Sequence, residues 1–484
     1  MKTNQNLTIR SLFLFPLAFL RQRLFYAFML LFVLNSAICS ENEYVGLTLI
    51  PPDQLTNKVD LDIRAGVILD NNRNQNQKVE VSIYLDKESK QNLIYYTSSP
   101  TIKNNKISIR HIIKTTDLIG DHKIILKVKT AGKKQYSMDK KFRVIDSDIR
   151  STKQIDGAWA GIYHWSESEG KNWNEDIKKM SNSQWSELVR SMNKLEMNTI
   201  VVQEVFRNEE YVGKHNLNLE NYQGKAFYPS KIYVERMPIS AEDPLEAILS
   251  EADKHGMNVF MGVGMYAWFD FTEGSLEWHK KIAKELWDKY GHHPSFYGFY
   301  VSEESGGSLD NWESTVEGQL KRKQEIVRFF QEFKLYCNDL APDKPIMLAT
   351  NSMGVPTGED TYPSLLQNLD ILCPFGFARM PEGDLTGKEA ADRLQAMCDR
   401  YGSHLWFDLE VFLFNPDQSL YPRPMDEIIK DLTLFDNFEK ILCYQYPGVF
   451  SDPEASIQVG EDRTKELFVK YQEYLKTLKL SRKK

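Results

Sequence analysis

Two apolar runs of this sequence end in carboxylate side chains. The first, HLWFDLEVF at 404–412, has the alternation of a β-strand. Successive side chains of a strand point to opposite faces, so Asp408 and Glu410 share one face with Trp406. Burying two acids is costly unless they have a partner or a purpose. The pattern therefore predicts either a functional pair or a salt bridge to a neighbouring basic residue.

The second run, FYGFYVSEESGG at 296–307, also ends in acids. If Phe299 and Val301 pack outward, Tyr300, Ser302 and Glu304 face the other way, and Glu303 leans toward a neighbouring strand. The alternative without a functional role is that Glu303 and Glu304 form an acidic pair at the surface. One carboxyl from each run would give the pair that glycoside hydrolysis requires: an acid that protonates the leaving oxygen, and a base or nucleophile at the anomeric carbon.

The elements that must position these acids begin near residue 155, where strands and helices start to alternate. Eight β/α alternations in this length predict a (β/α)8 barrel. In such a barrel the active site lies at the carboxyl ends of the strands, where both acidic runs end. The expected strands are 160–165, 198–205, 258–266, 296–302, 346–350, 369–375, 404–412 and 440–445. The expected helices are 183–194, 244–255, 276–290, 316–340, 362–368, 387–400, 425–437 and 463–480.

Residues 41–150 contain only short, alternating, β-branched runs separated by turn-rich pieces such as DNNRN at 70–74. Roughly seven such strands in about 100 residues predict an antiparallel sandwich of immunoglobulin type. The expected fold is therefore α/β, with this all-β domain ahead of a barrel domain at 151–484.

Residues 1–40 have the pattern of a secretory signal peptide. Lys2, Arg10, Arg21 and Arg23 precede an apolar run that ends near Cys39. We expect an exported protein, whether periplasmic, cell-surface or secreted. The membrane is expected as a partner only through the leader or through a lipid on Cys39.

Composition narrows the function classes. Of 484 residues 42% are hydrophobic, and 60 basic against 67 acidic side chains leave a net charge of −7. This balance excludes wholesale disorder and argues against nucleic-acid binding, which needs a basic surface. The sequence contains neither a CxxC nor an HExxH nor a nucleotide-binding glycine motif, so we expect no cofactor and no metal. The pair His292-His293 is interpreted as fixing a loop, and the later cysteines as buried thiols.

The GFYVSEE run at 298–304 resembles the strand-four motif of clan-A glycoside hydrolases, in which a glycine and an aromatic precede Asn-Glu. The resemblance implies that Glu304 is the acid/base and Glu410 the nucleophile of a retaining enzyme. This sequence departs from the motif because Glu303 stands where the clan has the asparagine that binds the sugar 2-hydroxyl. Residues 155–450 are also similar to uncharacterised glycosidase-like barrels of Bacteroidetes, described as domains of unknown function.

Other strand ends supply aromatic rings and hydrogen-bonding groups suited to sugars, which present apolar faces and hydroxyl rims. Each aromatic, taken singly, could equally belong to the core. The predicted substrate-binding residues are Glu303, Asp408, Tyr163, His164, Trp165, Gln203, Trp268, Asn351, Trp406 and Tyr444.

The sequence therefore favours an exported glycoside hydrolase that acts on a poly- or oligosaccharide. The first alternative is a non-catalytic glycan-binding barrel of the cell surface. The second is a structural or adhesion protein whose barrel is plugged by its own loops, for which the long insertion at 206–243 would be the candidate.

Overall fold

The structure is a computed structural model that describes residues 43–69, 78–99, 106–130, 134–207, 222 and 224–482. The predicted signal peptide lies outside the described residues. From residue 157 onward eight parallel strands close into a barrel in the order β10-β13-β14-β15-β16-β17-β20-β9. The (β/α)8 prediction is thus confirmed. The strands are β9 (Gly157–Ala160), β10 (Thr199–Val202), β13 (Asn258–Gly262), β14 (Phe296–Ser305), β15 (Ile346–Thr350), β16 (Ile371–Leu372), β17 (His404–Glu410) and β20 (Lys440–Tyr444).

The first barrel strand is the one whose position differs most from the sequence prediction. We expected it at 160–165, but β9 ends at Ala160, and its pairing with β10 covers Gly157–Ala160. Gly161–Trp165 continue the apolar character without joining the ladder, so a hydrophobic pattern alone misplaces the strand. Consequently Tyr163, His164 and Trp165 lie in the loop after the strand, at the end of the barrel where the chemistry is expected.

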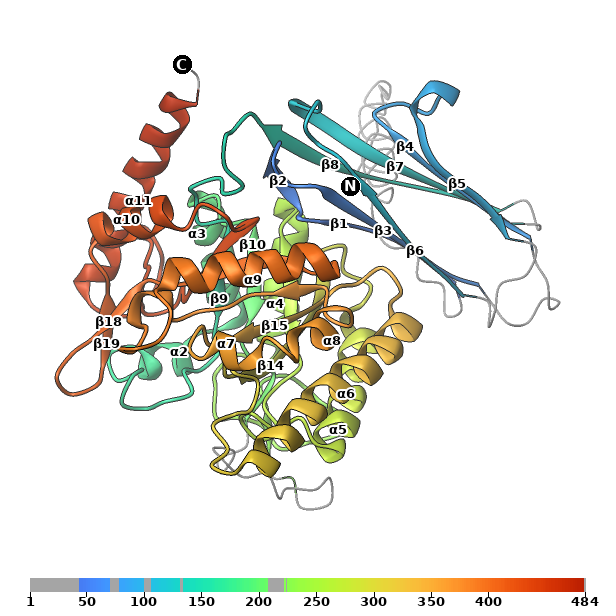
Figure 1. The fold of residues 1–484 in the computed structure, drawn as a ribbon. Coiled ribbons are helices and arrows are strands. Elements are labelled where there is room, and N and C mark those ends of the chain that lie inside the picture. Colours follow the sequence, from blue (N-terminus) through green and yellow to red (C-terminus); the bar gives the residue numbers. More distant parts are fainter. Residues whose placement is uncertain are drawn as a thin grey trace, which may run out of the picture. The chain divides into compact units, whose positions relative to one another are not determined.

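Helices surround the barrel, and several start with a side-chain cap. Ser181 with Gln184 and Thr386 with Glu389 form capping boxes, which satisfy backbone N–H groups at the helix start. Across the described residues, none of the helices combines the length and apolar character needed to span a bilayer. The barrel helices are α2 (Asn174–Lys179), α3 (Asn182–Lys194), α4 (Pro244–His255), α5 (Glu273–Tyr290), α6 (Val316–Leu340), α7 (Val355–Gly358), α8 (Tyr362–Leu366), α9 (Gly387–Tyr401), α10 (Met425–Leu434) and α11 (Asp462–Ser481), with a 3-10 turn at Phe377–Arg379 (Figure 1).

Two hydrophobic layers fix the direction of every barrel side chain. Trp406, Tyr300 and Phe260 belong to a cluster inside the barrel. Phe407 and Phe299 belong to the layer between the strands and the helices. The period-two prediction for the strands at 296–302 and 404–412 is therefore confirmed. Cys337, Cys373, Cys398 and Cys443 are buried free thiols, as expected.

The region 43–145, called the N-terminal β region below, consists of two sheets with strand orders β1-β3-β6 and β2-β8-β7-β4-β5 (Figure 1). An all-β region ahead of the barrel is confirmed; its immunoglobulin-like character stays a prediction. Its strands are β1 (Tyr44–Ile50), β2 (Asp53–Thr56), β3 (Leu61–Ile68), β4 (Val79–Leu85), β5 (Leu93–Ser99), β6 (Lys106–Ile113), β7 (Gly120–Thr130) and β8 (Gln135–Ile145), with a 3-10 turn at Lys90–Asn92.

The N-terminal β region is fastened to the amino ends of the barrel strands. Ile50, at the end of β1, is fully buried within the cluster inside the barrel. Nε2 of His404, the first residue of β17, lies 3.2 Å from Oδ2 of Asp62 on β3. Arg64 forms an ion pair with Asp370 over 3.0 Å. Because these contacts lie at the amino ends of the strands, the carboxyl ends are left to the loops that carry the candidate site. Further contacts of this kind join Tyr44 and Thr48 to Asp343, and Asp53 to Asn258.

Candidate active site

Glu304 lies where β14 leaves the barrel ladder. The pairing of β14 with β15 shifts between Val301 and Ser305, and Glu304 has a left-handed backbone with φ of 55°. Such a conformation costs about 1–3 kcal/mol in a residue with a side chain and tends to occur at functional sites. Nε1 of Trp268, in the loop after β13, donates a hydrogen bond of 3.3 Å to Oε2 of Glu304.

The surroundings of Glu304 suit a proton donor. Burial raises the pKa of its carboxyl to about 7, because the charged form is poorly solvated there. The hydrogen bond from Trp268 and the charge of Arg379 work in the opposite direction, while the charges of Glu169 and Glu204 add to the rise. A carboxyl with a pKa near neutral can hold a proton and release it during a reaction at neutral pH.

The strand-seven acids face Glu304 from β17. Asp408 is buried, and its Oδ1 has no hydrogen-bond partner among the residues that the structure describes. Burial and then the charges of Glu410 and Glu304 raise its pKa well above the ordinary value. Asp408 is therefore the carboxyl on which the charges of both Glu304 and Glu410 act. The prediction that strands four and seven bring their acids together is therefore consistent with the structure.

Glu410, the last residue of β17, is held by a guanidinium. Nε and Nη2 of Arg379 both lie 2.8 Å from Oε1 of Glu410. The carboxylate of Glu410 is therefore gripped through one oxygen. Arg423 donates to the backbone oxygen of the same residue over 3.2 Å, which fixes the end of the strand. A salt bridge to a basic residue was the alternative expected for the acids of strand seven. Glu410 forms such a salt bridge and also acts on the carboxyl of Asp408.

Further polar side chains come from the loop after β9 and from the end of β20. The ring of His164 is buried. Its Nε2 lies 3.0 Å from a carboxylate oxygen of Glu169, and its Nδ1 lies 3.2 Å from the hydroxyl oxygen of Tyr444. The charges of Glu304 and Asp408 both act on the Tyr444 hydroxyl, whose pKa burial raises. Gln203, at the end of β10, is buried with an unpartnered Oε1. Tyr444 and, through it, His164 thus join the predicted acids, and a sugar contact by Gln203 stays a prediction.

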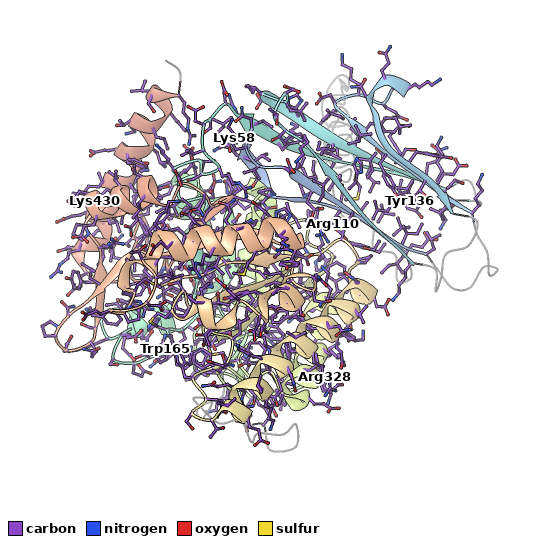
Figure 2. The ribbon with its side chains drawn as sticks, in the orientation of Figure 1. Lys58, Arg110, Tyr136, Trp165, Arg328 and Lys430 are labelled. Atoms are coloured by element: carbon purple, nitrogen blue, oxygen red, sulfur yellow. The ribbon has the colours of Figure 1, made fainter. Side chains whose placement is uncertain are left out.

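Aromatic rings border Glu304. The half-buried rings of Trp165 and Trp268 lie 5.1 Å apart between centroids, and Phe269 stacks on Trp268 at 4.6 Å. Figure 2 labels Trp165 in the barrel part of the molecule. Of the three tryptophans predicted as sugar contacts, Trp268 thus contacts the candidate acid and Trp165 contacts Trp268. Phe269 was not predicted; its left-handed φ of 66° is a feature that a sequence pattern does not reveal.

Two predicted site residues lie elsewhere. Glu303 is fully buried, its carboxylate accepts hydrogen bonds from the N–H groups of Tyr266 and Ala267, and it lies 3.8 Å from His279. It holds the loop after β13. Trp406 is fully buried beside Phe260 in the cluster inside the barrel. In this structure Glu303 supports a loop and Trp406 belongs to the core, and substrate binding by these two residues stays a prediction.

Two further predicted residues lie near the carboxyl end with partners of their own. Tyr163 is buried in the outer layer, donates to Glu167, and has the ammonium of Lys178 4.8 Å from its ring centre. Oδ1 of Asn351 accepts the N–H of Met353 over 2.8 Å. For both, a sugar contact stays a prediction. Part of the insertion at 206–243 that was considered as a plug, residues 208–221 and 223, lies outside the described residues.

Sequence reasoning missed Arg379, Glu169 and Trp312. All three lie in loops, where neither helical nor strand periodicity marks a direction. The one signal that could have found Arg379 is chemical: two inward acids at a strand end call for a nearby cation.

Within the described residues, Glu246, His292 and His293 form a group with spacing suited to a metal ion. Nδ1 of His293 lies 2.7 Å from Asp253 and Nε2 lies 3.2 Å from Glu246. Burial opposes protonation of His293, but these two carboxylates outweigh it and raise its pKa. The ring thereby bridges the two acids, which agrees with the loop-fixing interpretation.

Comparison with family models identifies the chain. Residues 155–457 match the model described as Domain of unknown function (DUF4434), which covers more than half of the sequence. The chain belongs to this family. It is thus a (β/α)8 barrel protein with acids at the carboxyl ends of its strands. No curated protein matches it.

Three of the solved structures that match this chain are as follows. A candidate alpha-L-fucosidase from Bacteroides thetaiotaomicron matches at 15% identity and a TM-score of 0.48, covering 68% of this chain and 96% of its own. The beta-glucuronidase of Bacteroides uniformis matches at 12% and 0.42, and the GH2 beta-galacturonidase of Eisenbergiella tayi at 12% and 0.39. These cover 90% and 86% of this chain, which spans 50% and 69% of their lengths. Similarity at this level carries no argument about the chemistry of this chain.

Proposed function

We propose that this protein is a glycoside hydrolase whose acid/base is Glu304 and whose nucleophile is Glu410. The observation that carries the proposal is that burial raises the pKa of Glu304 to about 7, and that the charges of Glu304 and Glu410 both act on the buried carboxyl of Asp408. Glycoside hydrolysis needs two carboxyls in different protonation states, and separate environments supply that difference. Burial favours the protonated form of Glu304, whereas Glu410 is paired with Arg379.

The chemistry follows from these states. A carboxylate oxygen of Glu410 attacks the anomeric carbon, the bond to the leaving oxygen breaks, and Glu304 gives its proton to that oxygen. The resulting carboxylate of Glu304 then takes a proton from water as the water oxygen attacks the anomeric carbon. The ester to Glu410 breaks, so both residues return to their starting states. The anomeric configuration is retained in this scheme.

The residues around the acids suit a carbohydrate. His164, Tyr444 and Gln203 offer hydrogen bonds to hydroxyl groups, and Trp165 and Trp268 offer flat apolar faces. The leader-like pattern of residues 1–40 and the sugar-oriented site together favour an exported protein that meets its glycan outside the cytoplasm. The N-terminal β region, which we interpret as immunoglobulin-like, would serve as a support for the barrel.

A non-catalytic glycan-binding barrel is the second candidate. The observation that favours it is the grip of Arg379 on Oε1 of Glu410, which a substrate would have to accommodate before that carboxylate attacks. Under this function the same aromatic and polar groups bind a sugar chain without cleaving it.

A released-sugar assay separates the two. Protein starting at residue 43 is incubated with plant, host and microbial glycans, and products are measured by mass spectrometry for the native sequence, for Glu410→Gln and for Glu332→Gln. Glu332 is a matched control because it pairs with Arg328 on the outer helix α6, where Figure 2 labels that arginine. Products from the native protein and the control, but not from Glu410→Gln, support hydrolysis. Glycan binding without products from any of them supports the binding barrel.

A further inference from the structure

Trp312 follows Glu304 by a short loop and is 54% exposed. Single exposed aromatics are common on protein surfaces and need no explanation by themselves. Here, however, the backbone beneath the ring is left-handed at three positions: Leu309 with φ of 61°, Asn311 with 51° and Trp312 with 58°. Each such residue costs about 1–3 kcal/mol and persists only where its surroundings impose the conformation.

Side chains tie this loop down. Nδ2 of Asn311 donates to the carbonyl of Phe269 over 3.0 Å, and its Oδ1 accepts from the hydroxyl of Ser305 at 3.0 Å. Oδ1 of Asp310 accepts the N–H of Trp312 over 3.1 Å. The loop is thus built to hold one conformation, and that conformation leaves an indole ring in solvent.

The exposed ring ends a row of aromatic contacts that starts at the acid. The ring centres of Trp312 and Phe269 are 4.8 Å apart, and those of Phe269 and Trp268 are 4.6 Å apart with nearly parallel planes. Trp268 donates to Glu304 and lies 5.1 Å from Trp165. We call these four rings (Trp165, Trp268, Phe269, Trp312) the ring row. It runs from Glu304 outward through the loops after β9, β13 and β14.

The two arginines of the site occupy other loops. Arg379 and Arg423, which hold Glu410, come from the segments after β16 and β17. An acid/base delivers its proton to the leaving oxygen, so groups beside the acid contact the leaving part of the substrate. The ring row stands beside the acid, and flat apolar rings suit the apolar faces of sugar units.

We propose that Trp312 is a stacking platform for a sugar unit on the leaving-group side, so that the substrate is a chain of several sugars rather than one sugar on a small group. This inference rests on the proposed function, because Glu304 defines which side is the leaving side. The competing explanation is structural: the indole covers Gly306, where an added Cβ would lie 3.2 Å from it.

Chain length distinguishes these explanations. We would compare Trp312→Ala, Trp312→Phe and the control Tyr96→Ala, whose ring is 53% exposed on β5, on a chain-length series of the glycan that the native protein cleaves. A platform predicts that Trp312→Ala lowers kcat/KM on long chains by about three- to tenfold and leaves the shortest cleavable chain unchanged. Trp312→Phe should recover most of that loss. An equal loss at all lengths, or no loss, overturns the platform.

A binding measurement keeps this result separate from the proposed function. Glu304→Gln, alone and combined with Trp312→Ala, would be applied to an array of plant, host and microbial oligosaccharides. If the native protein cleaves nothing but the combined variant loses binding to long chains, hydrolysis and the leaving-side assignment fail, and Trp312 is a sugar-stacking residue of a binding barrel. If the native protein cleaves glycans and binding ignores Trp312, the platform fails alone. If no glycan is bound or cleaved, both proposals are contradicted.

Discussion

The indole N–H of Trp268 donates to Oε2 of Glu304 across 3.3 Å, from a different loop of the barrel. This bond stabilises the ionised carboxylate, so it lowers the pKa that burial raises to about 7. The acid of the reaction must be protonated, and kcat/KM should therefore fall as the pH rises through about 7. Trp268→Phe keeps a ring but removes the donor, so this limb should move to higher pH. A limb that stays in place in kcat/KM profiles of both proteins would show that Glu304 does not govern it.

Replacing the acid itself should separate catalysis from stability. Glu304→Gln removes the transferable proton at nearly constant shape, and we expect turnover of a natural glycan to fall by about 10²–10⁴-fold. Because the native carboxyl is poorly solvated, the variant should unfold at the same temperature or higher at pH 8. Glu332→Gln should change neither property. Turnover by Glu304→Gln at the native rate would remove Glu304 from the mechanism.

Asp408 is a buried carboxyl with a pKa well above its ordinary value, for which burial is the main cause and the charges of Glu410 and Glu304 the next. A raised pKa means that the folded state binds its proton more tightly, so this group contributes stability at low pH that is lost as the pH rises above about 4. Asp408→Asn mimics the protonated form. Denaturant unfolding should show the variant gaining about 1–3 kcal/mol over the native protein between pH 4 and pH 8. A constant difference across that range would contradict the assignment.

His404 joins the barrel to the N-terminal β region, with Nδ1 2.6 Å from Glu439 and Nε2 3.2 Å from Asp62. Burial lowers its pKa, but these carboxylates outweigh burial and raise it to about 9. The stability from this group is complete below about pH 6.5 and is lost as the pH rises to about 9. His404→Gln should be least stable relative to the native protein at pH 6, by on the order of 3 kcal/mol, and the gap should narrow by pH 9.5. His255→Gln, on the half-exposed ion pair with Glu251, serves as the control.

The sequence predicted which way side chains point better than it predicted their positions along the barrel axis. Period two correctly assigned Trp406 and Asp408 to the inside of the barrel. It could not tell that Trp406, about 7 Å further down the strand, lies within the core, because periodicity carries no information on depth. Glu303 and Glu304 are consecutive in the strand, so alternation predicts that their side chains point in opposite directions. The same rule that directs Glu304 toward the acids therefore directs Glu303 away from them.

Loops account for what the sequence could not provide. Arg379, Phe269 and Trp312 reach the site through left-handed or irregular backbone, which leaves no periodic trace. The ion pairs at the amino ends of the strands were missed for a related reason: Asp62 and His404 are far apart in sequence, and each alone resembles an ordinary surface residue. The fold could be predicted because barrel strands and helices repeat a pattern eight times.

Azide rescue tests the roles of the two glutamates most directly. Azide can enter where a carboxylate has been removed and attack the anomeric carbon as the leaving group departs. On a substrate with a good leaving group, azide should restore turnover of Glu410→Ala and give a glycosyl azide of inverted configuration. With Glu304→Ala it should give a glycosyl azide of retained configuration. Native-level turnover by either variant without azide, or the same product configuration from both, would contradict the assignment of Glu304 as acid/base and Glu410 as nucleophile.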